Sequence, residues 1–99
     1  MNELAEYLID VLSPLGRLSA RRMFGETCLF VNGQMFAIIS ADDDIFVKTH
    51  HLTDGDIPFT YQRQGKTVAM RYIKIDNSLL DDADMLISVI RQKLHNEKS

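Results

Sequence analysis

Residues 23–40 read MFGETCLFVNGQMFAIIS, and this segment does the most to determine the architecture. Asn32 and Gly33 separate two β-prone runs. A two-residue type I′ turn needs a positive φ at both central positions, which Asn and Gly adopt most readily. The segment therefore predicts a hairpin, with one strand over residues 23–31 and a return strand over residues 34–40. Gly25 is expected at a bulge or bend within the first strand.

More strands follow this hairpin. The acidic residues 42–44 predict a second turn, and residues 45–49 predict a third strand that completes an antiparallel meander. After a polar link, residues 59–63 and 67–75 predict a second hairpin, and residues 59–63 show the period-two alternation of a half-buried strand. Gln64 and Gly65 lie at its turn.

Two amphipathic helices are predicted to enclose these strands. The first covers residues 3–15, and the second begins after Asp81, with Asp84 in the position of a capping box. Their apolar stripes have helical spacing and comprise Leu4, Leu8, Val11, Leu12 and Leu15 in the first, and Met85, Leu86, Val89, Ile90 and Leu94 in the second.

The order of elements predicts the fold class. A helix, three strands, a link, two strands and a final helix favour a two-layer α+β fold. We expect a five-stranded, mainly antiparallel sheet with the helices packed on one face. The length of 99 residues predicts a single domain over residues 1–99.

One predicted strand is apolar on both of its sides. Residues 35–39, MFAII, do not alternate as a strand covered on one face should, and Phe46 has the opposite parity to Ile45 and Val47. Two interpretations stay open. A helix or loop covers a second apolar face, or that face binds another copy or a partner protein.

Composition restricts the classes of function. Eleven Lys and Arg face fourteen Asp and Glu, for a net charge of −3, and this lack of a basic excess argues against direct nucleic-acid binding. Cys28 is the single cysteine and cannot form an internal disulfide, which fits a reducing compartment. No run of apolar residues reaches the length of a membrane span, and the N-terminus lacks the features of a signal peptide. We therefore expect a cytoplasmic protein without membrane contact.

The sequence offers few candidates for chemistry. His50 and His51 lack further Cys or His ligands at zinc-binding spacing. Residues 42–44 lack the remaining ligands of a calcium-binding loop. Cys28 has no general base at a spacing in the sequence that would indicate a catalytic pair. No catalytic residue, metal ligand or cofactor site is therefore predicted. The remaining candidates for binding are two groups of cationic side chains, one near residue 20 and one on the second predicted hairpin. They are Arg17, Arg21, Arg22, Arg63, Lys66, Arg71 and Lys74.

Several spaced motifs resemble a known family. They are Arg21-Arg22-Met23-Phe24-Gly25, Leu29-Phe30, Met35-Phe36-Ala37, Pro58-Phe59-Thr60-Tyr61, and Met70 with Tyr72. In this order they resemble the N-terminal domain of the TfoX/Sxy family of bacterial competence regulators. The resemblance implies the order α-β3-α-β2-α, with a middle helix that the short link here would reduce. It implies no catalytic residues.

The function expected from the resemblance and the two-sided strand is a non-enzymatic regulatory module that binds proteins. Its partner would belong to the transcription machinery or be a transcriptional regulator, and a homodimer is also expected to form. The residues predicted to bind the partner are Arg21, Arg22, Phe24, Met35 and Phe46. Two alternatives stay open, a chaperone-like dimeric binding domain and a small enzyme of unknown reaction.

Overall fold

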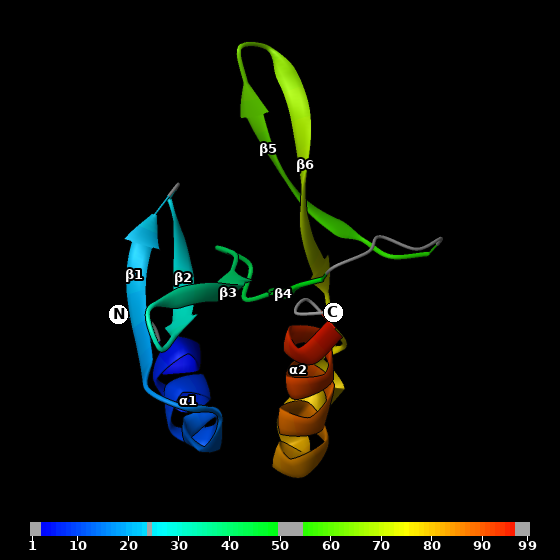
Figure 1. Ribbon diagram of the computed structural model, residues 1–99. Helices are drawn as coiled ribbons and strands as arrows, with labels where there is room; N and C mark the ends of the chain where they lie inside the picture. Colours follow the sequence, from blue (N-terminus) through cyan, green and yellow to red (C-terminus); the bar gives the residue numbers. More distant parts are fainter. Residues whose placement is uncertain (1–2, 24, 50–54, 97–99) are drawn as a thin grey trace.

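The computed structural model describes residues 3–23, 25–49 and 55–96. Within them, a six-stranded sheet carries two α-helices on the same side (Figure 1). The predicted α+β class is confirmed. The elements are α1 (Glu3–Val11), η1 (Ser13–Leu15), β1 (Leu18–Met23), β2 (Glu26–Val31), β3 (Gln34–Ile39), β4 (Ile45–Lys48), β5 (Pro58–Arg63), β6 (Lys66–Lys74), η2 (Asn77–Asp81) and α2 (Ala83–Asn96), where η marks a 3₁₀ helix.

The sheet has the order β1-β2-β3-β4-β6-β5, and every neighbouring pair is antiparallel. The predicted count of five strands was wrong, because the strand expected over residues 23–31 begins only at Glu26. Gly25 has a φ of 76° and turns the chain, so that Met23 pairs with Glu26 and β1 forms an extra edge strand. Glycine tolerates this conformation because it has no Cβ.

Both predicted two-residue turns are confirmed. Asn32 and Gly33 have φ values of 52° and 85° between β2 and β3, while Gln64 and Gly65 have values of 53° and 77° between β5 and β6. Positive φ at both positions is the mark of a type I′ turn, whose twist matches that of the flanking strands.

The helix ends differ from the prediction. The first α-helix stops at Val11 rather than at residue 15, because Pro14 disfavours a helical residue before it and the chain tightens into η1. The cap of α2 is Asp82 rather than Asp81: the Met85 amide donates to the Asp82 carboxylate at 3.1 Å. In the described part of the chain, neither helix is long and apolar enough to cross a membrane.

The middle helix implied by the family resemblance falls in a link of which residues 50–54 lie outside the described residues. The described residues of the link, 49 and 55–57, contain no helix.

The main core lies between the sheet and the two helices. Its side chains come from both helices and from one face of the central strands, which confirms that the helices pack on one face. The buried members are Ala5, Leu8, Leu12, Leu29, Phe36, Ala37, Ile39, Ile45, Val47, Ile75, Leu86 and Ile90. Burial of this apolar surface is the principal source of stability for the two-layer arrangement.

Candidate functional site

A second apolar cluster lies on the sheet face opposite the helices. The centre of this cluster is a row of side chains across three neighbouring strands, because Cys28 pairs with Ile38 and Ile38 pairs with Phe46. Its buried members are Cys28, Ile38, Phe46, Phe59 and Tyr72, and its half-buried members are Met23, Phe30, Met35, Tyr61 and Met70. We call this group the second cluster.

A β-bulge explains why residues 35–39 are apolar at both parities. Leu29 pairs with Ala37 and Phe30 pairs with Met35, so that Phe36 is an extra residue on β3. Phe36 and Ala37 therefore both face the main core, whereas Met35 belongs to the second cluster. A bulge of this kind re-aims side chains without ending the strand pairing.

Two contacts connect the β5–β6 hairpin to the middle of the sheet. The rings of Phe46 and Phe59 meet edge to face, with centroids 5.4 Å apart and planes at 77°. The Tyr72 hydroxyl donates a hydrogen bond of 3.4 Å to the Met35 carbonyl. These contacts fix the base of the hairpin against β3 and β4.

The structure brings three of the five predicted partner-binding residues to this face. Arg21 lies over the Phe30 ring, 5.7 Å from its centroid, which is cation–π geometry. Met35 is half-buried, while Phe46 is only 8% exposed and is therefore part of the cluster's interior. Arg22 is exposed but pairs with Thr27, which places it on the opposite side of β1. Phe24 lies outside the described residues, and the assignment of all five to partner binding stays a prediction.

Cys28 is fully buried in the second cluster. Burial, followed by the negative charge of Glu26, raises the pKa of its thiol, so that the thiol stays protonated at neutral pH. A protonated thiol without solvent access is a poor nucleophile. One carboxylate oxygen of Glu26, Oε2, is itself buried and has no hydrogen-bond partner in the part of the chain that the structure describes. The candidate ligands His50 and His51 lie outside the described residues.

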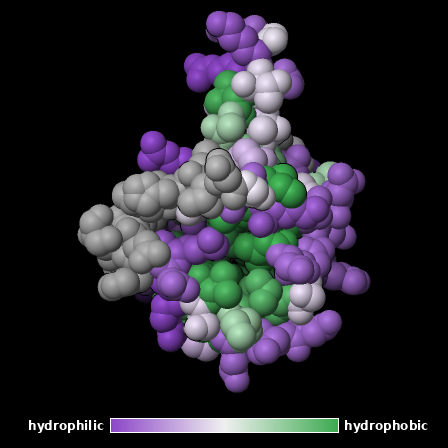
Figure 2. Space-filling model, turned by 90° about the vertical axis from the view of Figure 1, so that its right-hand side faces the viewer, coloured by the Kyte–Doolittle hydropathy of each residue, from purple (hydrophilic) through white to green (hydrophobic). Residues whose placement is uncertain are grey.

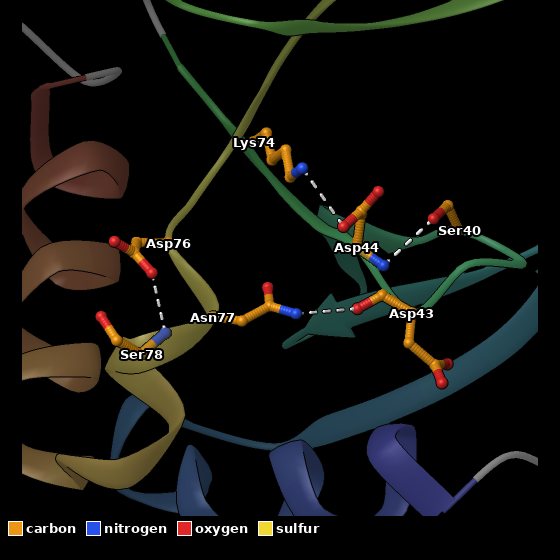
Figure 3. A network of polar contacts seen from close by, with 7 residues as sticks. All are labelled: Ser40, Asp43, Asp44, Lys74, Asp76, Asn77 and Ser78. Atoms are coloured by element: carbon orange, nitrogen blue, oxygen red, sulfur yellow. Dashed lines mark hydrogen bonds and ion pairs between the residues drawn. The ribbon is translucent and has the colours of Figure 1, made fainter.

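A shallow groove borders the ends of β4 and β6 and has a volume of about 500 Å³. Lys74 and Asp44 form an ion pair of 3.4 Å in its wall, and the Asn77 amide donates to the Asp43 carbonyl (Figure 3). These contacts hold the β3–β4 turn against the end of β6.

Asp76 also lines this groove, and its carboxylate accepts a hydrogen bond of 2.9 Å from the Ser78 amide. The hydrogen bonds from Ser78, aided by the charge of Lys74, lower the pKa of Asp76 and keep it ionised. Among the described residues, no group of three His, Cys, Asp or Glu could hold a metal ion. The groove therefore has the contacts of a structural junction.

Charge is unevenly distributed between the two layers. The four strands of the β1–β2 and β5–β6 hairpins carry six cationic side chains and one carboxylate, whereas α1 carries three carboxylates and no cation. The net charge of −3 conceals this separation, so it could be recognised only once β1 had been identified as a strand. The six cations are Arg21, Arg22, Arg63, Lys66, Arg71 and Lys74.

The β5–β6 hairpin extends away from the helices. Its turn lies at the end of the molecule opposite α1 and α2 (Figure 1). Hydrophilic side chains gather at the tip of this hairpin, above hydrophobic ones nearer the body (Figure 2). The second cluster therefore lies between the edge strand β1, which carries Arg21, and a projecting hairpin with Arg63 and Lys66 beside its turn.

The family model described as the TfoX N-terminal domain matches residues 10–96, which is nearly the whole chain. No curated protein matches the chain.

Proposed function

Because this chain belongs to the TfoX N-terminal domain family, which is associated with the regulation of competence, we propose that it is a regulatory domain that acts on transcription by binding another protein. The observation that carries this proposal is the second cluster. Its half-buried side chains lie on the sheet face opposite the helices, where a partner can cover them. Exposed apolar surface that is bordered by polar residues is typical of protein-binding sites.

Neither Cys28 nor Asp76 has the shift in pKa that a catalytic nucleophile or general base needs. A catalytic nucleophile needs a lowered pKa or a nearby base, but burial raises the pKa of Cys28. A general base needs a pKa near the working pH, but hydrogen bonding lowers the pKa of Asp76. Both shifts favour the ordinary charge states of these groups at neutral pH.

Affinity capture from a bacterial lysate tests the proposal. The chain carries a tag and is compared with the tag alone, at low and at physiological salt, and the recovered proteins are identified by mass spectrometry. We expect RNA polymerase subunits or a transcriptional regulator to be enriched on the chain. Recovery of neither at either salt concentration would contradict the proposed role.

A further inference from the structure

We propose that the second cluster and the two cationic hairpins form one docking face for an acidic, amphipathic segment of a partner protein. This inference rests on the proposed function and adds the chemistry of the partner. It concerns the sheet face opposite the helices (Figure 1).

The floor of the docking face is apolar and adaptable. Met23, Met35 and Met70 are half-buried there beside Phe30 and Tyr61. Methionine side chains are flexible and polarisable, and for this reason they are common where a surface accepts an apolar partner. Apolar residues of the bound segment would cover the exposed parts of these side chains.

Cations lie on both sides of this floor. Arg21 shares the face of the second cluster, because it pairs with Cys28 across β1 and β2. On the other hairpin, Arg63 pairs with Lys66, and both are exposed. Arg63 has the same strand parity as Tyr61, which places it on the same face. The bound segment should therefore carry carboxylates toward both of its ends.

Within residues 3–23, 25–49 and 55–96, Asp44 and Glu26 are two carboxylates on this face, and both lie away from the tip of the β5–β6 hairpin. Asp44 is engaged in the ion pair with Lys74, at the end of β6 away from the tip. Glu26 has a buried oxygen and lies beside Cys28 at the start of β2. Neither carboxylate is on the β5–β6 hairpin tip, where Arg63 and Lys66 lie.

The strand register sets the length of the segment. Arg21 lies in one row across the sheet with Lys74, four inter-strand spacings or roughly 19 Å away. Lys66 lies eight residues further along β6, which adds roughly 26 Å along the strand. The diagonal from Arg21 to the hairpin tip is therefore roughly 32 Å, and a helix of about 22 residues spans it.

The aromatic rings favour a protein over a single-stranded nucleic acid. Binding of unpaired bases relies on successive rings with open faces. Here Phe46, Phe59 and Tyr72 are buried, and Arg21 already lies over Phe30.

The test uses a fluorescein-labelled helical peptide of leucine and glutamate, about 22 residues long, with the glutamates concentrated at both ends. Its affinity is measured by fluorescence anisotropy for the wild-type chain and for two double variants. Arg63→Glu/Lys66→Glu reverses the charge at the hairpin tip. Arg71→Glu/Arg91→Glu makes the same change in net charge at exposed positions, on the side of β6 opposite Met70 and on α2.

We expect the hairpin variant to bind the peptide about tenfold more weakly, and the control variant to bind it within about twofold of the wild type. Met70→Gln should weaken binding about fivefold, since it removes apolar contact from the floor without changing charge. Circular dichroism verifies that each variant is folded.

Three results would overturn the docking face. They are an absence of peptide binding at low salt, an equal loss of affinity in both double variants, and tighter binding of a 20-nucleotide oligothymidine than of the peptide. The lysate experiment separates this inference from the proposed function. If Arg63→Glu/Lys66→Glu captures the same regulators as the wild type, the docking face is wrong and the regulatory role stands.

Discussion

The side chain of Phe46 on β4 connects the β2–β3–β4 meander to the β5–β6 hairpin. It lies in line with Cys28 and Ile38 across the strands of the first meander, and its ring meets Phe59 of the second hairpin. Because only 8% of it is exposed, its main role in the isolated chain is to hold the second cluster together.

Replacement of Phe46 by Asp should unfold the domain or destabilise it by about 4 kcal/mol, because a carboxylate would be buried without a partner and the aromatic contact would be lost. Phe46→Leu keeps the site apolar and should cost about 1 kcal/mol. Urea denaturation followed by circular dichroism measures both effects. Met85→Asp, at a position that is half exposed on α2, serves as the control. A Phe46→Asp chain as stable as the wild type would show that Phe46 is not a core residue.

The thiol of Cys28 reports on the same cluster. Its raised pKa has two causes, burial first and the charge of Glu26 second. Glu26→Gln removes the second cause, so the pKa should fall but stay above its ordinary value. The measurement is the ¹³Cβ chemical shift of Cys28 in the folded chain as a function of pH, with Glu6→Gln on α1 as the control. A midpoint that stays in place or rises in Glu26→Gln would rule out this electrostatic contribution.

The same shift has a consequence for stability. The folded chain holds the Cys28 proton to a higher pH than the unfolded chain does, so stability falls as the pH rises above the ordinary thiol pKa. Below that value, the thiol is protonated in both states and contributes no pH dependence.

Among the elements, the start of α2 allows a sharp comparison between two neighbouring aspartates. Asp82 accepts a hydrogen bond from the Met85 amide, whereas Asp81 ends η2. Asp82→Ala should therefore lower the free energy of unfolding by about 1 kcal/mol, the usual effect of removing an N-cap. Asp81→Ala should change it by less than about half as much. Thermal or urea denaturation of the two variants measures the change in the free energy of unfolding. Equal decreases in both variants would show that Asp82 is not the N-cap of α2.

The elements also show which parts of the fold the sequence could predict. The turn at Asn32-Gly33 was predictable, because positive φ at two successive positions restricts the residues that fit and Asn-Gly fits best. The turn at Gln64-Gly65 was predictable from its glycine between two β-prone runs, although Gln64 adopts a φ of 53° that its residue type does not favour. Residues 18–23 were missed as a strand because LSARRM is an edge strand with polar and charged side chains, and it lacks the apolar run of a central strand. The bulge at Phe36 depends on pairing with β2, which local sequence does not encode.

For the molecule as a whole, the distribution of charge matters more than its sum. The sequence predicted a second apolar face from residues 35–39 and Phe46, and the second cluster confirms that such a face exists. The cationic side chains could not be placed from the sequence, because Arg21 and Arg63 are more than forty residues apart and come to one face only through the strand order. Net charge averages over the acidic helix α1 and the cationic hairpins, and so it hides the feature.

The most direct test of this account asks which face of the ¹⁵N-labelled chain the acidic peptide contacts. Amide chemical shifts are recorded during a titration with the peptide. The account predicts that the perturbed amides fall in β1, β3, β5 and β6, around the second cluster, while α1 and α2 remain unchanged. Perturbations concentrated in the two helices would contradict it, because the partner would then bind the layer that covers the main core.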